Sequence, residues 1–260
     1  MKKKKKIALV LSGGGALGCA HIGVIKVLEK YKVPIDIIVG TSMGGVVGAG
    51  YSAGLSVQEM VDFAVKFKTT DFLDMNFNAS GVFSGKGVMK IINKFLPDIN
   101  IENLNKTFAC VSSDLLSATE YVFTSGSIRE AVRATLSLPG VFVPVKKEDK
   151  ILVDGGMLNN LPENVAYDLG ADIVISCDVL ANFNLTKAPK SAVESLIWGI
   201  NITTKKLQIL KGYSADVVLK PNMQGLGQIL FTKKKAELAI RRGEQEAERM
   251  IKDILKLIKE

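Results

Sequence analysis

Two short apolar runs, each followed by a glycine-rich turn and then by apolar residues at helical spacing, constrain the fold most strongly. The first run is IALVL at 7–11, and the second is IDIIV at 35–39, ahead of GTSMG at 40–44. Similar runs recur at 107–112, 120–124, 151–153 and 173–179. Apolar runs that alternate with helical patterns are typical of parallel strands joined by crossover helices. Because the runs lack polar alternation, the sequence predicts an α/β fold whose mainly parallel central sheet is buried on both faces.

A single domain over residues 1–260 accommodates this pattern, because 260 residues with 47% hydrophobic content can bury a large core. Two terminal segments stand apart, a basic tail at 1–6 and a C-terminal helix at 232–259. The apolar residues of that helix share one stripe, which favours packing on the core over a membrane anchor. The stretch before it has a weak pattern and predicts only a helix around Trp198 and a strand at 216–219.

The positive charge of the chain is concentrated in its first residues. The formal net charge is +8, of which Lys2 to Lys6 supply five, so the rest of the chain carries about +3. No basic patch with interleaved aromatic residues appears, which argues against a nucleic-acid partner. A lysine run is usually a solvated tail, although its charge also permits peripheral contact with an anionic membrane. The oligomeric state has no signature in the sequence.

The sequence also indicates a cytoplasmic location. No stretch approaches the roughly 20 apolar residues of a membrane span, and the run at 7–11 is too short for the apolar core of a secretory signal. The three cysteines, Cys19, Cys110 and Cys177, are widely spaced in apolar segments. Such spacing favours buried, reduced thiols over a disulfide framework or a zinc site. The lysine tail also permits an alternative location, in which the protein is peripherally attached to the inner face of the membrane.

The first glycine turn, GGGALG at 13–18, fits the pattern G-x-G-x-x-G. Dinucleotide-binding folds use this pattern, but they also need an acidic residue at the far end of the second strand. The candidate, Asp36, lies at the near end instead. The turn still offers successive backbone amides at a helix N-terminus, which can bind a phosphate or the transient oxyanion of acyl transfer.

The second glycine turn, GTSMG at 40–44, matches G-x-S-x-G between a strand and a helix. That context is the one a nucleophile elbow requires, because Gly40 and Gly44 leave room for a sharp turn that presents the Ser42 hydroxyl. The alternative is that these small residues only pack a helix against the sheet. Since both glycine turns end strands at the carboxyl edge, where open sheets bind ligands, we expect them to form one site.

A serine nucleophile needs a base, and the candidates are few. The single histidine, His21, precedes Ser42, which is the wrong order for an α/β-hydrolase, and a lone helical histidine is usually structural. Asp154 follows the apolar run at 151–153 and is itself followed by two glycines. A carboxylate at a sheet edge is partly desolvated, which raises its pKa and makes it a better base. A dyad of Ser42 and Asp154 is therefore the simplest hypothesis.

Five motifs in this order resemble those of the patatin-like phospholipase family. They are Gly13 to Gly18, HIGV at 21–24, GTSMG at 40–44, SLPGVF at 137–142 and DGG at 154–156. The chain is most similar to the short bacterial members related to the catalytic domain of neuropathy target esterase. The resemblance covers roughly residues 5 to 180. One departure is Leu17, which stands where many bacterial members carry arginine.

The resemblance implies an α/β/α sandwich and hydrolysis of acyl esters in lipids, especially phospholipids or lysophospholipids. It implies that Ser42 and Asp154 form the dyad and that the backbone of Gly13, Gly14 and Gly15 forms the oxyanion hole. It also implies that neither a metal nor an organic cofactor takes part. The glycines that support these motifs are Gly18, Gly40, Gly44, Gly155 and Gly156.

Two other function classes remain open on the sequence. The first is a noncatalytic acyl- or lipid-binding protein on the same fold, and the second is a nucleotide-binding regulator that uses Gly13 to Gly18. An acyl chain would need an apolar trough, which could come from Met75, Phe77, Val82 and Phe83. Those four side chains could equally well do no more than pack their own loop.

Overall fold

A computed structural model describes residues 5–72, 83–184, 188–229 and 231–259 of the chain. Within these ranges, eight strands form one sheet in the order β5-β6-β3-β2-β1-β7-β8, and β4 also pairs with β3. The five strands from β3 to β8 in this order are parallel to one another, whereas β4, β5 and β6 pair antiparallel. The strands are β1 (Ile7–Leu11), β2 (Ile37–Thr41), β3 (Thr107–Asp114), β4 (Thr119–Phe123), β5 (Val145–Lys147), β6 (Lys150–Asp154), β7 (Ile173–Cys177) and β8 (Val217–Leu219).

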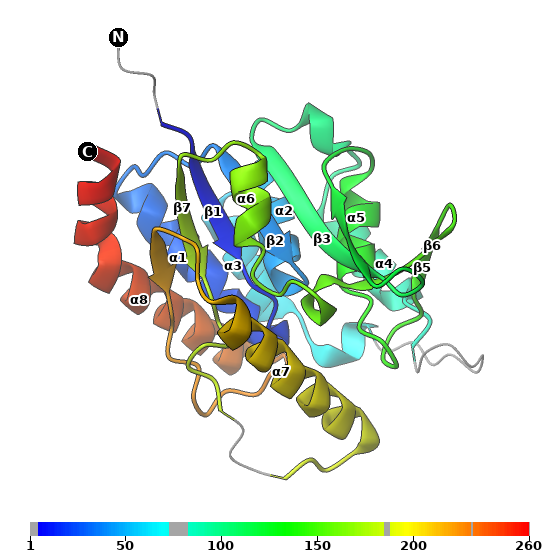
Figure 1. Cartoon of the computed structure of the whole chain (residues 1–260). Helices are drawn as coiled ribbons and strands as arrows, with labels where there is room; N and C mark the ends of the chain where they lie inside the picture. Colours follow the sequence, from blue (N-terminus) through cyan, green and yellow to red (C-terminus); the bar gives the residue numbers. More distant parts are fainter. Residues whose placement is uncertain (1–4, 73–82, 185–187, 230, 260) are drawn as a thin grey trace.

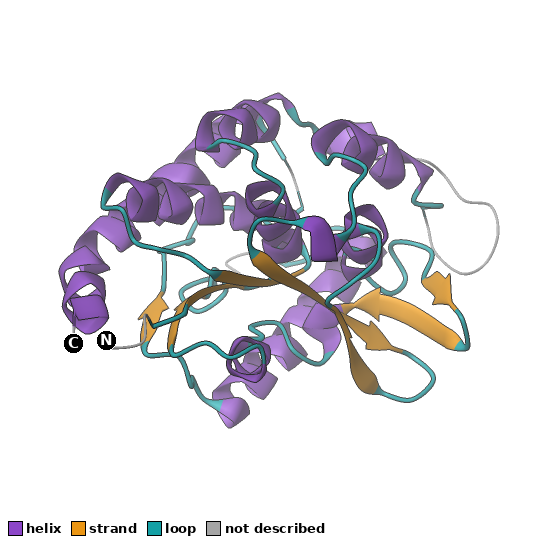
Figure 2. Ribbon diagram, turned by 90° about the horizontal axis from the view of Figure 1, so that it is seen from above, coloured by secondary structure: helices purple, strands orange, loops and turns teal. Residues whose placement is uncertain are grey.

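Helices cover both faces of the sheet, but unequally (Figure 2). One face packs against α1 (Ala20–Lys30), α2 (Met43–Ser52), α3 (Val57–Lys66), α4 (Lys86–Phe95), α5 (Ile128–Thr135) and α8 (Lys233–Lys259). The other face packs against α6 (Glu163–Asp168). On this face α6 packs on valine and isoleucine side chains of the strands, and Ala8 and Ala109 lie among them. The expected fold class, three layers around a mainly parallel sheet, is confirmed.

The ends of β2 and β6 meet along one edge of β3. Strand β2 pairs with residues 107–111 of β3, whereas β6 pairs with residues 112–114. Strand β4 occupies the opposite edge over 110–114, so β2 and β6 must share the same edge. Because β2 runs parallel to β3 and β6 antiparallel, their carboxyl ends point toward each other. The residue that follows β2 therefore lies beside the last residue of β6.

Most elements expected from the sequence are present, with differences at their edges. Strand β2 begins at Ile37 rather than 35, because Pro34 has no N–H and the Asp36 carboxylate takes the Ile7 amide (3.0 Å). Strand β5 was not expected, because it is only three residues long and half-exposed. The expectation that the sheet is buried on both faces is wrong for β4, whose first residues Thr119 and Glu120 are exposed.

The C-terminal helix packs on the body of the protein, as its apolar stripe predicts. Helix α8 lies against α1, and a β-carbon at Gly23 would come within 2.0 Å of the Ile240 carbonyl. Two surface ion pairs, Lys26 with Glu244 and Lys30 with Glu248, flank this contact. None of the helices in the described residues is both long enough and apolar enough to cross a membrane.

Candidate active site

Ser42 occupies the sharp turn between β2 and α2. Its backbone has φ 52° and ψ −125°, which is costly for a residue other than glycine. The surrounding chain is so close that the neighbouring positions admit only glycine: a β-carbon at Gly40 would lie 2.5 Å from the Gly44 carbonyl, and one at Gly44 would lie 2.2 Å from the Leu11 carbonyl. This strained, close-packed turn between a strand and a helix is the geometry that a nucleophile elbow requires.

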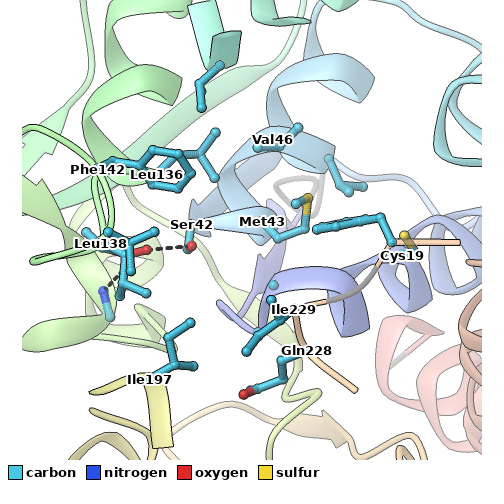
Figure 3. A pocket seen from close by; sticks show the side chains of 18 of the residues that line it. Cys19, Ser42, Met43, Val46, Leu136, Leu138, Phe142, Ile197, Gln228 and Ile229 are labelled. Atoms are coloured by element: carbon cyan, nitrogen blue, oxygen red, sulfur yellow. Dashed lines mark hydrogen bonds between the residues drawn. The ribbon is translucent and has the colours of Figure 1, made fainter. Parts of the chain in front are cut away.

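Asp154, the last residue of β6, accepts a hydrogen bond from this serine. The Ser42 Oγ donates to Asp154 Oδ2 at 2.6 Å, the bond drawn from Ser42 in Figure 3. The other carboxylate oxygen accepts a hydrogen bond from the Gly156 amide at 2.8 Å, so both oxygens of the carboxylate are hydrogen-bonded. A β-carbon at Gly155 would come within 2.3 Å of the Val111 carbonyl, which explains the glycine after the aspartate.

Burial makes Asp154 a stronger base than an exposed aspartate. Its side chain is only 6% exposed. Desolvation raises the pKa of Asp154 from 3.8 to about 6, and the hydrogen bonds from Ser42 and the Gly156 amide limit that rise. The group is therefore mostly ionised at neutral pH, yet its proton affinity is well above that of an ordinary carboxylate. A base poised near the working pH is what general-base catalysis favours.

The first glycine turn lies directly against the serine. A β-carbon at Gly13 would be 3.2 Å from the Ser42 β-carbon, so a larger residue would crowd the hydroxyl. The Gly13 amide donates to the Asn160 carbonyl at 3.1 Å, which corrects the expectation that it faces an oxyanion. The amides of Gly14 and Gly15 have no hydrogen-bond partner within the described ranges, and both residues line the cavity at Ser42. Of the three backbone amides in this turn, two are therefore free to donate to a bound group in the described structure.

The remaining residues of this motif have structural positions. A β-carbon at Gly18 would lie 2.4 Å from the Met43 Cγ, so this glycine lets the first turn pack on α2. Leu17 is fully buried in the core. His21 is also fully buried, and its Nε2 donates to the Ser12 carbonyl at 2.9 Å. Burial lowers the pKa of His21 to about 4, so the ring is neutral, and it bonds the backbone rather than Ser42.

Thr135 is a site residue that the sequence did not reveal. This threonine ends α5 and is fully buried. Its Oγ1 accepts the Ser42 amide at 2.7 Å and donates to the Val111 carbonyl. It therefore ties the turn at Ser42 to Val111 of β3. Nothing in the sequence pairs a threonine at a helix end with a turn 93 residues away.

Removing this hydroxyl is expected to destabilise the fold. Thr135→Val keeps the side-chain shape but leaves the Ser42 amide and the Val111 carbonyl buried without a partner. Each unsatisfied group costs about 1–3 kcal/mol, so we expect urea denaturation to give a free energy of unfolding about 2–6 kcal/mol lower. Thr135→Ser keeps the hydroxyl and is the matched control. Equal stability of the two variants would contradict the assigned hydrogen bonds.

An apolar cavity of about 450 Å³ extends from Ser42 and Asp154 into the helical layer. Figure 3 shows Met43, Val46, Leu136, Phe142 and Ile197 around the serine. Farther along, the lining comes from α3 and α4, with Met60, Phe63, Ala64, Val88, Ile91, Ile92 and Phe95. Phe83 lines the cavity as expected, whereas Met75, Phe77 and Val82 lie outside the described residues. The size and apolar lining suit a hydrocarbon chain.

The cavity is a poor match for a nucleotide or a metal ion. A bound pyrophosphate at Gly14 and Gly15 would lie near the Asp154 carboxylate, which would repel it. Across the parts of the chain that the structure describes, no group of three or more His, Cys, Asp or Glu residues is arranged to hold a metal ion. All three cysteines are buried and free, as the sequence predicts. The arrangement favours attack on an acyl group by serine.

Comparisons with known proteins show which family this chain resembles. The family model described as patatin-like phospholipase matches residues 9–167. Patatin-like phospholipase domain-containing protein 6 of Mus musculus is 38% identical over 181 residues, and neuropathy target esterase sws of Drosophila melanogaster is 34% identical; each match covers 66% of this chain and 13% of the relative. An uncharacterised NTE family protein of Mycobacterium bovis is 37% identical over 62% of this chain and 28% of its own length.

A solved structure supports the fold. The crystal structure of VipD from Legionella pneumophila aligns with a TM-score of 0.65 at 14% identity, covering 96% of this chain and 67% of that one. At this identity the likeness concerns the fold alone. The chain thus spans about an eighth of the length of the animal relatives and about two thirds of the VipD chain.

Proposed function

This chain belongs to the patatin-like phospholipase family, and from that premise we propose that it hydrolyses fatty acyl esters of lipids with a catalytic dyad of Ser42 and Asp154. The observation that carries the proposal is the 2.6 Å hydrogen bond between these two side chains in the wall of a deep apolar cavity. The family supports lipid acyl hydrolysis in general. The site supports a serine nucleophile, a carboxylate base and an acyl chain as the group bound.

The first half of the reaction transfers the acyl group to the protein. The Ser42 oxygen forms a bond to the ester carbonyl carbon while the Asp154 carboxylate accepts the hydroxyl proton. The carbonyl oxygen becomes an oxyanion, which the amides of Gly14 and Gly15 stabilise; one such donor is worth roughly 3 kcal/mol of barrier. Asp154 then returns its proton to the departing alcohol oxygen as the carbon–oxygen bond breaks.

The second half releases the fatty acid. Water takes the position of the departed alcohol, and Asp154 accepts one of its protons as the hydroxide forms a bond to the acyl carbon. The Ser42 oxygen leaves and recovers that proton from Asp154. Every proton transfer in the proposed mechanism passes through Asp154. The three free, buried cysteines support the proposed cytoplasmic location, since a reducing compartment keeps thiols of this kind free.

The test of this proposal is the release of free fatty acid by the purified, folded protein. Lysophosphatidylcholine, phosphatidylcholine and a short-chain nitrophenyl ester are compared as substrates. We expect hydrolysis of the nitrophenyl ester and of at least one phospholipid. If folded protein binds a fatty acid but cleaves none of the three esters, the noncatalytic lipid-binding alternative replaces the hydrolase.

Narrowing the cavity where α3 lines it is expected to change chain-length preference. Ala64 on α3 lines this part of the cavity, and phenylalanine there would occupy space that a long acyl chain needs. We expect Ala64→Phe to lower the ratio of kcat/KM for a palmitoyl ester to that for a butyryl ester at least tenfold. Overpacking itself costs about 1–3 kcal/mol of stability, so thermal unfolding is measured in parallel.

Ala64→Ser, which hardly changes the volume, is the control and should keep the wild-type ratio. A ratio unchanged by Ala64→Phe would mean that the acyl chain does not reach α3. The proposed hydrolysis would survive that result, but the assignment of this part of the cavity to the acyl chain would not.

A further inference from the structure

Helix α7 (Ala192–Lys211) exposes a set of large aliphatic side chains. Ile202, Ile209 and Leu210 are 68%, 71% and 70% exposed, and Leu196 and Leu207 are also exposed. Single exposed apolar residues are common, but several on one helix usually mark an interaction site. We name Ile202, Ile209 and Leu210 the outer face of α7.

The contacts of α7 with the body of the protein are unusually polar. The Thr204 hydroxyl donates to the Gly156 carbonyl at 3.1 Å, and the Asn201 side-chain amide donates to that of Gln228. The Lys211 ammonium donates to the Asn159 Oδ1 at 2.8 Å. A surface helix of a water-soluble domain normally turns its apolar side inward and its polar side to water. Helix α7 is anchored by these polar groups and turns Ile197 and Ile200 toward the cavity, yet it also turns aliphatic side chains outward.

The same helix forms one wall of the candidate active site. In Figure 1, α7 lies at the end of the sheet where the parallel strands finish. Ile197 and Ile200 of α7 line the cavity, and Figure 3 shows Ile197 pointing toward the region of Ser42. A partner that binds the outer face is therefore separated from the reacting serine by the thickness of one helix.

We propose that the outer face of α7 docks on the surface of an anionic phospholipid bilayer and brings the cavity to its lipid substrate. This inference rests on the proposed lipid hydrolysis. A bilayer interface accepts aliphatic side chains and attracts lysines beside them. Helix α7 carries three lysines and one acidic residue, Glu194, so its charge is +2. Lys206 is exposed four residues after Ile202 and therefore lies beside the outer face. Lys205 and Lys211 point to the body of the protein, where they donate to the Phe183 carbonyl and to Asn159.

The one tryptophan of the chain lies on this helix as well. Trp198 is half-buried, four residues before Ile202, so the two side chains are neighbours on the helix surface. Tryptophan is enriched at membrane–water interfaces, where its ring meets the headgroups and its N–H keeps a polar partner. Its position beside the outer face also provides an intrinsic reporter of docking.

A second copy of the chain is a weaker occupant for this face. A stable protein interface buries roughly 800 Å² on each partner. An aromatic side chain buries about 150–250 Å², and an aliphatic side chain buries less. The three side chains of the outer face would therefore bury less than about 800 Å² even if each were fully exposed beforehand. A bilayer needs no matching shape, so an exposed aliphatic face on a positively charged helix is sufficient.

The experiment measures Trp198 fluorescence and vesicle cosedimentation with the full chain. Vesicles contain equal parts of phosphatidylglycerol and phosphatidylcholine, and Ser42→Ala is introduced into every protein so that the lipid stays intact. We expect the emission to shift to shorter wavelength on vesicle addition. Ile202→Gln combined with Ile209→Gln is expected to weaken vesicle binding at least tenfold. Ile202→Leu with Ile209→Leu retains the apolar character and should bind as the parent does.

Three results would overturn the docking proposal: vesicle binding unchanged by the glutamine pair, loss of binding when Lys2 to Lys6 are changed to glutamine while α7 is intact, or light scattering that shows the outer face buried in a dimer. Hydrolysis of the soluble nitrophenyl ester, measured with Ser42 present, separates the two proposals. If the Ile202→Gln/Ile209→Gln protein cleaves this ester normally but neither it nor its parent binds vesicles, the docking proposal fails and the hydrolysis proposal stands. If vesicles bind and the wild type cleaves no ester, the hydrolase proposal fails.

Discussion

Replacing Ser42 by alanine is expected to reduce ester hydrolysis by a factor on the order of 10⁵–10⁶, the loss that follows when the nucleophile of a serine hydrolase is removed. The substitution deletes the one oxygen that can bond to the acyl carbon, while Asp154 and the two glycine amides stay in place. Alanine keeps the β-carbon, so the strained turn and its packing against Gly13 are retained. Fatty acid release from the best substrate, with circular dichroism to verify folding, is the measurement.

Ser52→Ala is the matched control for this loss. Ser52 is the last residue of α2, the helix that follows Ser42, and it is a buried serine whose hydroxyl has no hydrogen-bond partner in the described structure. We expect Ser52→Ala to retain wild-type activity. If Ser42→Ala also retained activity, water rather than serine would be the nucleophile, and the covalent half of the proposed mechanism would have to be abandoned.

The parts of the site that the sequence predicted are those set by local chain geometry. The two glycine turns each follow an apolar run, and steric contact at Gly40 and Gly44 explains why only glycine serves there. The order of five motifs identified the family, and the match of the family model over residues 9–167 confirms it. Local features of this kind need only the strand, the turn and the helix that follows.

The parts that the sequence missed depend on contacts between distant segments. Asp154 was expected at a sheet edge, but only the shared edge of β3 explains how β6 delivers it to the end of β2. The Gly13 amide was expected to face an oxyanion, and the Asn160 carbonyl takes it instead. Helix α7 was only partly anticipated, because its outward aliphatic side chains remove the amphipathic pattern on which prediction depends.

Asp154→Asn is expected to lower kcat by a factor on the order of 10⁴, because an amide can accept the Ser42 hydrogen bond but cannot take up its proton. The same substitution is expected to raise stability. In the folded protein the pKa of Asp154 rises from 3.8 to about 6, so the unfolded chain ionises at lower pH than the folded one. Stability therefore falls as pH increases from about 4 to 6, and the loss stays constant above that range.

The difference between the two pKa values corresponds to a cost of up to about 3 kcal/mol at pH 8. Asparagine does not ionise, so urea denaturation should show Asp154→Asn to be more stable than wild type at pH 8 and nearly equal to it at pH 4. Asp149→Asn, at an exposed aspartate before β6, should change stability by no more than about 0.5 kcal/mol at either pH. An Asp154→Asn protein that is inactive but gains no stability at pH 8 would show that the carboxylate is not strained by burial, and the base would then need another source of proton affinity. If Asp154→Asn instead lowers kcat and raises stability at pH 8, the folded protein holds Asp154 ionised at a cost in stability. That cost would be the consequence of keeping a buried base for the reaction.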